Sequence, residues 1–287
     1  MSKRIFVIAD HGLALIYFLQ SDVIPTLLKA GVEIVLFTDD ESLLAIEARF
    51  HQAGLIFEGI RTKACENYSQ TVDPFIQRCL QMLRWVGGSN RINVTAMDGN
   101  YHLLAAAFTG RGRFALPGLR GVIWLMRRSR PLRRFIVHAQ QRYTPNIYAD
   151  LFKKYQPDLV VSRTPGWRTD RYILREAARR RIRTAAVTIG WDNPSSYNLS
   201  GAPVDYITCW SEIQKEEFVL GSDWEPARVH IGGVPAYDGY FKREWLIPRG
   251  EYFRQHGLDP NRQLLSYACS FETLHPNFPN IAAIAEL

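Results

Sequence analysis

The chain has 287 residues, of which 47% are hydrophobic, and its formal net charge is +7. This length and apolar content predict one large or two smaller globular domains, and they exclude a disordered or fibrous protein. The first apolar run, residues 5–9, is too short for a signal peptide, and no stretch of about 18 apolar residues exists to span a membrane. The four cysteines form no CxxC pair, so we expect free thiols rather than a disulfide framework or structural zinc site.

The beginning of the chain alternates strand and helix signals. An apolar-rich helix is expected over 13–29 and ends at Gly31, and a second helix, capped by Thr38, Asp39 and Asp40, runs to about residue 52. Short apolar runs predict buried parallel strands on either side of these helices, at 5–9, 32–37 and 55–58. This βαβαβ order is typical of a doubly wound sheet.

The middle of the chain, at about 72–155, has mixed apolar and polar helix faces and no clear strand signal. We expect it to form a helical insert. It also contains a local excess of arginine: Arg111, Arg113, Arg120, Arg127, Arg128, Arg130, Arg133 and Arg134.

Strand and helix signals alternate again after the insert. Helices are expected at 170–181 and 212–220. Strands are expected at 158–162, 184–189, 206–209 and 229–231. The predicted fold class is therefore α/β, with a Rossmann-like parallel sheet in an N-terminal domain over residues 1–240.

The last segment, 241–287, begins as a linker and then repeats the same type of signal. A helix at 245–256, a buried strand at 264–268 and a helix at 278–287 are expected. One strand with two helices has no second layer to pack against, so we interpret this segment as the truncated start of a second Rossmann-like domain.

Loops with polar and aromatic side chains follow most of the strands of the first domain. In an open parallel sheet, ligands bind outside the carboxyl ends of the strands, so these loops are expected to contain the site. Aromatic faces together with carboxylates and amides suit carbohydrate rings, which have apolar faces and a rim of hydroxyls. The expected site residues are Asp10, His11, Gly12, Arg163, Trp167, Trp191, Asp192, Asn193, Ser195, Ser211 and Glu212.

His11 is the candidate general base of this site, with Asp10 beside it, because the pKa of histidine lies near neutrality. The alternative is a neutral histidine that packs against its loop or donates to Asp10.

The segment Trp191-Asp192-Asn193 follows a buried strand directly, and we predict that it contacts the substrate. The alternative is a structural loop cap, in which Asp192 or Asn193 bonds the backbone ahead of Pro194.

Three interpretations of the arginine-rich segment remain open. It can be a solvated helix face, or it can dock on an anionic membrane through Arg127, Arg128, Arg133 and Arg134. In the second case Trp124 and Phe135 would insert beside the arginines. Nucleic acid ranks last, because no nucleic-acid-binding module accompanies the charge.

Several motifs are absent from the sequence. There is no G-x-G-x-x-G after the first strand, no P-loop and no G-x-S-x-G elbow. There is also no D-x-D pair, and the histidines show no i,i+4 pairing, so we expect neither a cofactor nor a metal.

Three stretches resemble bacterial GT-B proteins related to surface-polysaccharide glycosyltransferases, CDP-glycerol glycerophosphotransferases and UDP-N-acetylglucosamine 2-epimerases. The first is the opening strand with its Asp10-His11-Gly12 loop, and the second is 188–196 with the following 204–212. The third, 229–238, is similar to the family's last strand and its Gly-x-Pro turn, with Gly233 and Pro235 before the crossover to the second domain. Ser270 would open the first loop of that nucleotide-binding domain.

The resemblance implies transfer of a sugar from a nucleotide-sugar donor to a glycan or lipid-linked acceptor in surface-glycan synthesis. The acceptor would bind the first domain and the nucleotide mainly the second. Such a protein would be cytoplasmic or peripheral at the inner face of the plasma membrane. The alternatives are a 2-epimerase or a glycerophosphotransferase on the same fold, or a non-catalytic module that binds membrane surfaces.

Overall fold

The computed structural model describes residues 3–196, 199–244, 246–268 and 278–285. The chain divides into two compact units, Met1–Asp238 and Gly239–Leu287. Each unit is described by itself below.

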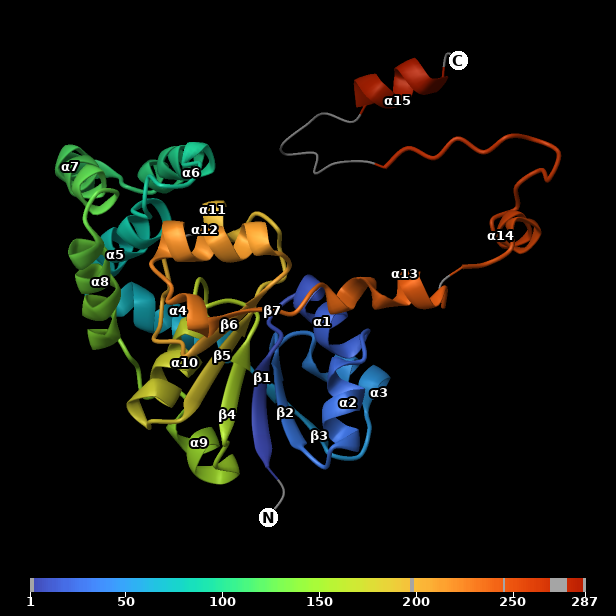
Figure 1. The fold of residues 1–287 in the computed structure, drawn as a ribbon, viewed down its shortest axis with the longest axis horizontal. Coiled ribbons are helices and arrows are strands. Elements are labelled where there is room, and N and C mark those ends of the chain that lie inside the picture. The colour runs from blue at the N-terminus through green and yellow to red at the C-terminus, as the bar shows by residue number, and fades with distance from the viewer. Residues whose placement is uncertain (1–2, 197–198, 245, 269–277, 286–287) are drawn as a thin grey trace. The chain divides into compact units, whose positions relative to one another are not determined.

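Unit 1 is built on a seven-stranded sheet in which every pairing is parallel, with the order β3-β2-β1-β4-β5-β6-β7 (Figure 1). The strands are β1 (Arg4–Ile8), β2 (Glu33–Thr38), β3 (Leu55–Gly59), β4 (Leu159–Ser162), β5 (Arg183–Val187), β6 (Tyr206–Cys209) and β7 (Val229–Ile231). The predicted α/β class with a Rossmann-like parallel sheet is thus confirmed. The run of apolar residues in β1 is explained by burial on both faces, since successive side chains point to opposite sides of a sheet.

One face of the sheet packs against three helices from the beginning of the chain. Ile5 and Val7 of β1 lie in a core with Tyr17 and Phe18 of α1 and Ile24 of α2. These helices are α1 (Gly12–Leu19), α2 (Val23–Lys29) and α3 (Leu43–Phe50). The expected single helix over 13–29 is divided, because the Ser21 hydroxyl donates to Tyr17 O and accepts from Val23 N, which replaces helical bonding at this point.

The other face packs against helices that come later in the chain. Phe6 and Ile8 of β1 lie in a second core, with Phe152 of α9 and Ile173 of α10. The helices here are α4 (Thr62–Thr71), α9 (Ala149–Tyr155) and α10 (Asp170–Arg179), while α11 (Asn193–Ser196) and α12 (Glu212–Ser222) follow β5 and β6.

The segment between β3 and β4 forms helices and no strand, and part of it has a core of its own. Met82, Met97, Ile123 and Ile136 meet in this core, from four different helices. The helices are α5 (Pro74–Val86), α6 (Thr95–Ala106), α7 (Leu116–Met126) and α8 (Arg130–Ala139), with the short turns η1 (Gly110–Ala115) and η2 (Gln140–Arg142). We call α5 to η2 the helical insert; its helices lie beside the sheet and its covering helices in Figure 1.

The predicted cap of the helix after β2 is wrong. Ser42 precedes α3, and Asp40 instead accepts the N–H groups of Arg61 (3.0 Å) and Thr62 (2.7 Å) at the start of α4. Asp40 therefore joins the loops after β2 and β3, which sequence spacing could not indicate because Arg61 lies 21 positions away.

Unit 2 contains helices α14 (Arg249–Gln255) and α15 (Phe278–Ala285), and α13 (Asp238–Lys242) begins at its boundary. The predicted strand at 264–268 is wrong, since these residues form no strand. A strand needs a hydrogen-bonded neighbour, and the described residues of unit 2 include no second strand to supply one. The expected hinge residue Ser270 lies outside the described residues.

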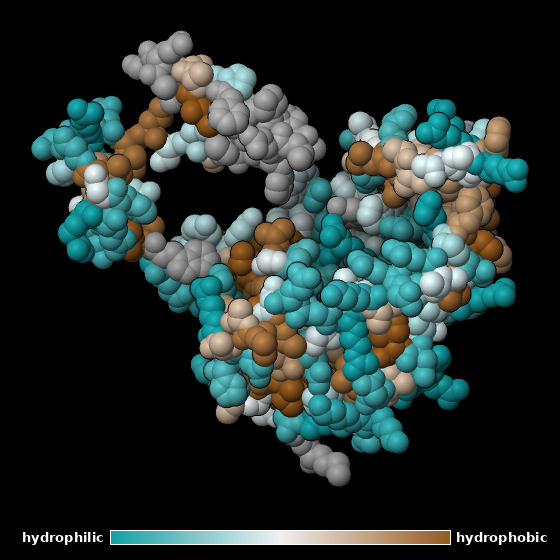
Figure 2. Space-filling model, turned by 180° about the vertical axis from the view of Figure 1, so that it is seen from behind, coloured by the Kyte–Doolittle hydropathy of each residue, from teal (hydrophilic) through white to brown (hydrophobic). Residues whose placement is uncertain are grey.

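The surface on the face shown in Figure 2 mixes hydrophilic side chains with separate hydrophobic areas. Of the helices in the described part of the chain, none combines the length and apolarity needed to cross a lipid bilayer.

Candidate functional site

The strand order places a topological switch point between β1 and β4. The chain continues from β1 to β2 on one side, and returns to β4 on the other side of β1. In open parallel sheets this reversal opens a crevice outside the carboxyl ends of the two strands, which is the usual ligand site. The residues that follow these two ends are Asp10 and His11 after β1, and Arg163 after β4.

Asp10 and Arg163 form an ion pair at the switch point. Arg163 donates through Nε to Asp10 Oδ1 and through Nη2 to Oδ2 at 3.2 Å. Both side chains are about nine-tenths buried, with exposed fractions of 10% and 6%. The two predicted residues are therefore brought together, and each neutralises the other where an isolated buried charge would be costly.

His11 is the N-cap of α1. Its Nδ1 accepts a hydrogen bond from Ala14 N at 3.2 Å. Burial, and then the nearby Arg163 charge, lower the pKa of His11 below its usual value, so the ring is neutral at pH 7. In a neutral ring with its Nδ1 lone pair engaged, Nε2 carries the proton and donates. A base role for His11 thus requires the hydrogen bond from Ala14 to open.

The three residues of the loop after β5 that were predicted to contact the substrate have different surroundings. Asn193 is buried, and its Oδ1 accepts from Gly190 N at 2.9 Å. The Asp192 carboxylate accepts from Ser196 Oγ at 3.0 Å. Trp191, by contrast, is 73% exposed. The structural alternative holds for Asn193, and Trp191 is the side chain that this loop presents to a ligand.

A buried glutamine, which no sequence pattern singled out, orders the loops after β5 and β6. Gln214 Oε1 accepts from Trp210 N at 2.8 Å, and its Nε2 donates to Gly190 O and Trp191 O, both at 2.9 Å. Two hydrogen bonds from this side chain therefore hold the backbone at Gly190 and Trp191, and the third ties the same side chain to the loop after β6.

Of the other residues predicted to contact the substrate, two bond within the protein and two are exposed. Ser211 caps α12 by accepting from Gln214 N at 3.3 Å, and Ser195 Oγ donates to Asp192 O at 3.0 Å. Glu212 and Gly12 are exposed in the first turns of α12 and α1, where a ligand can reach them.

The assignment of Trp167 to the site is wrong. Its ring is 3% exposed and packs in a core with Ala186 of β5 and Phe218 of α12. Gly233, with φ +70°, and Pro235, the first residue of the 3-10 turn η4 (Pro235–Tyr237), follow β7 near the end of unit 1.

Of the four arginines predicted to face a membrane, two are largely buried and two are exposed. Arg133 is buried and pairs with Asp223, and Arg127 is mostly buried with Nη1 2.9 Å from Asp98 Oδ1. The prediction is wrong for these two, because burial keeps both guanidinium groups from a lipid surface. Arg128 and Arg134 are exposed.

In the described ranges, no group of three His, Cys, Asp or Glu side chains is placed to hold a metal ion. The sequence matches no protein-family model and no curated protein.

Proposed function

We propose that unit 1 is the acceptor-binding domain of a nucleotide-sugar-dependent glycosyltransferase of the GT-B type. The observation that carries this proposal is the arrangement at the carboxyl edge of the sheet. Asp10, His11 and Arg163 follow the two strands at the switch point, and the exposed indole of Trp191 follows β5 of the same sheet.

Each residue has a role in the proposed site. The Trp191 face would stack on the apolar face of an acceptor sugar, a contact that needs an exposed ring on a fixed backbone. His11 would donate from Nε2 to an acceptor oxygen, and it would act as the base only after Nδ1 releases Ala14 and takes the proton. The Asp10–Arg163 pair would hold the two loops at a fixed separation.

The remaining parts of the proposal follow from the resemblance. The donor would be a nucleotide sugar and the acceptor a glycan or a lipid-linked sugar. A lipid-linked acceptor would bring the protein to the cytoplasmic face of a membrane.

The proposal is tested with the natural protein and a panel of donors. Nucleotide release and the sugar products are measured with UDP-, GDP-, CMP- and dTDP-sugars and CDP-glycerol, each with and without a lipid and glycan extract. A sugar donor consumed only when acceptor is present supports the proposal. Conversion of UDP-N-acetylglucosamine without acceptor supports the epimerase, consumption of CDP-glycerol alone supports the glycerophosphotransferase, and no turnover contradicts enzymatic function.

A second candidate function, docking on anionic membranes, is favoured by one feature of the insert. Trp124 of α7 is exposed, and the Arg128 guanidinium lies 4.2 Å from its ring centroid. Phe135 and Arg134 of α8 are also exposed. An aromatic ring beside an unburied cation suits the boundary between lipid headgroups and acyl chains.

Liposome sedimentation tests this candidate. Binding to anionic but not neutral vesicles, without any sugar nucleotide, is expected to be lost in Arg128→Gln/Arg134→Gln. Unchanged vesicle binding by the double variant would contradict this candidate function. So would the absence of vesicle binding by the natural protein at low salt.

A further inference from the structure

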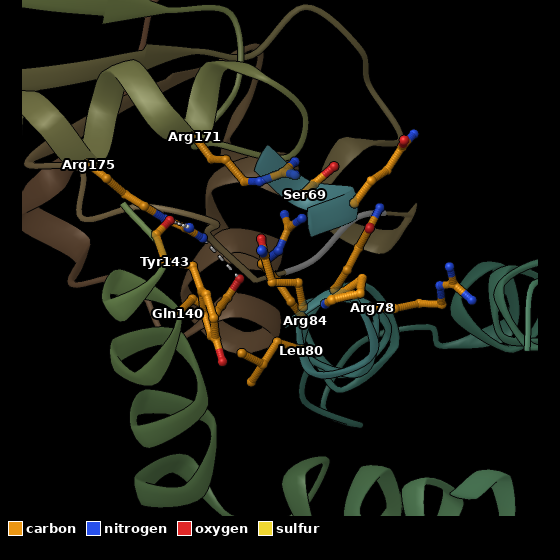
Figure 3. Close-up of a pocket in the computed structure, with 12 residues that line it drawn as sticks. Ser69, Arg78, Leu80, Arg84, Gln140, Tyr143, Arg171 and Arg175 are labelled. Atoms are coloured by element: carbon orange, nitrogen blue, oxygen red, sulfur yellow. Dashed lines mark hydrogen bonds between the residues drawn. The ribbon is translucent and has the colours of Figure 1, made fainter. Parts of the chain in front are cut away.

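A cavity of about 390 Å³ lies between the helical insert and α10, and its lining includes no residue of the carboxyl-edge site. Its walls come from α4, α5, the end of the insert and α10 (Figure 3). None of its lining residues is one of those predicted from the sequence. Its volume is within the range of small-molecule sites, about 300–1,000 Å³.

Three arginines converge on this cavity from two helices. Arg84 comes from α5, while Arg171 and Arg175 are one turn apart on α10 and so lie on the same face of that helix. Figure 3 shows the guanidinium groups of all three directed toward the space between the helices. A fourth arginine, Arg78, points aside and donates to Ala107 O at 2.9 Å.

No acidic side chain lines the cavity, and the hydrogen-bond partners of the three arginines are neutral. Arg84 donates to Gly166 O (3.2 Å) and Trp167 O (3.1 Å), while its Nε is buried and makes no hydrogen bond within the described residues. The partners of Arg175 are Gly201 O, Tyr143 O and Gln140 Oε1, and those of Arg171 are Arg168 O and the Tyr172 hydroxyl.

Two neighbouring carboxylates make no hydrogen bond to these arginines, although the charge of Asp170 partly opposes the lowering of the pKa values of Arg84 and Arg175. Asp170 accepts from the hydroxyls of Ser162 and Thr164 and from Arg168 N. Asp73 accepts from the Tyr143 hydroxyl at 3.2 Å. Neither carboxylate lines the cavity.

This arrangement is electrostatically costly for the protein alone. Burial, and then the charge of Arg171, lower the pKa of Arg175 to about 9, and the same two causes lower the pKa of Arg84. Charged groups are seldom buried without a counter-charge, because desolvation is not then repaid. One carboxylate, Asp170, offsets this only in part, and an anion in the cavity would supply the rest of the counter-charge.

We propose that this cavity is a binding site for the diphosphate group of a ligand. Guanidinium groups match phosphate oxygens with paired donors, and three of them balance the charge of a diphosphate. The side chains of Ser69, Gln77 and Gln81 also line the cavity and offer hydrogen bonds to the uncharged part of the ligand. The proposal is independent of glycosyl transfer, since the two sites share no residue.

The test uses inorganic pyrophosphate as the probe, with the purified natural protein. Its binding is measured by calorimetry and by the thermal unfolding midpoint, at an ionic strength held constant with chloride. We expect saturable binding and a raised midpoint. Arg171→Gln should weaken binding by about tenfold or more, because one charged hydrogen-bond donor is lost. The matched control is Arg111→Gln, which removes an exposed arginine outside the cavity.

Arg171→Gln also separates ligand binding from a structural role. If the role of Arg171 is to bind the ligand, removing its charge relieves its repulsion of Arg84 and Arg175. The thermal unfolding midpoint of the variant without pyrophosphate should then be equal to or above that of the natural protein. A lower midpoint with unchanged pyrophosphate affinity would overturn the proposal, as would the absence of saturable binding in the natural protein.

Competition identifies where the diphosphate comes from. Displacement of pyrophosphate by UDP or CDP assigns a nucleotide, and displacement by farnesyl diphosphate assigns an isoprenoid carrier. Either result supports the site.

Discussion

The Arg133 guanidinium donates to both carboxylate oxygens of Asp223, with Nε–Oδ2 and Nη2–Oδ1 distances of 2.6 and 2.7 Å. Arg133 lies on α8 of the helical insert, and Asp223 follows the last residue of α12. Both side chains are largely buried, and Nη1 also donates to Met126 O at 2.6 Å. This pair therefore ties the insert to the loop that leads into β7.

Replacing Arg133 is expected to destabilise unit 1 strongly. Arg133→Ala leaves the buried Asp223 carboxylate without its main partner, and breaking a buried pair in this way costs about 3–5 kcal/mol. Urea unfolding measures the loss. Arg134→Ala is the matched control, because its exposed pair with Glu225 is worth about 1 kcal/mol or less. Equal losses in the two variants would contradict the assigned role of Arg133.

His11 is expected to make stability depend on pH in mildly acidic solution. Its pKa is lowered in the folded protein, so between the unfolded value of 6.5 and the folded value the unfolded chain binds more protons. The free energy of unfolding therefore falls as pH decreases below 6.5, and this contribution levels off beneath the folded pKa.

The comparison uses His11→Asn, since asparagine retains an N-cap acceptor but does not titrate. Subtracting the unfolding free energy of His11→Asn from that of the natural protein at each pH isolates the imidazole. A difference that grows as pH increases toward 6.5 agrees with the prediction. A flat difference, or one of opposite slope, would show that the ring is not held neutral.

Asn193→Ala is expected to lower the free energy of unfolding by about 1 kcal/mol, because it leaves a half-buried backbone N–H without its acceptor. That group is Gly190 N, which Asn193 Oδ1 accepts at 2.9 Å. Trp191→Ala, two positions before Asn193, removes an exposed ring and should leave stability almost unchanged. Chemical denaturation measures the free energy of unfolding of both variants. A larger decrease in Trp191→Ala than in Asn193→Ala would contradict the structural role of Asn193.

The parallel sheet could be predicted because its strands are apolar runs buried on both faces, such as 5–9 and 32–37. The predicted strand at 264–268 has the same composition, but apolar content alone does not supply a neighbouring strand. The hydrogen bonds of Asp40 were missed for a related reason: their donors, Arg61 N and Thr62 N, are near in space and distant in sequence.

Sequence position indicated which loops reach the carboxyl edge, and it could not say which side chains there are exposed. Asn193 and Trp191 are two positions apart, yet one is buried in the loop and the other is open to solvent. The cavity of Arg84, Arg171 and Arg175 was missed because two helices contribute to it. The spacing of Arg171 and Arg175 on one predicted helix face was the only signal.

The central claim, that an acceptor sugar binds at the carboxyl edge through Trp191, is tested most directly by acceptor kinetics. Sugar transfer is measured against acceptor concentration for the natural protein, for Trp191→Ala and for Phe114→Ala, which removes an exposed ring of the insert instead. The account predicts that Trp191→Ala lowers kcat/KM for the acceptor about tenfold, the loss expected for one stacking contact, and that Phe114→Ala leaves it unchanged. Equal kcat/KM values for all three proteins would contradict it.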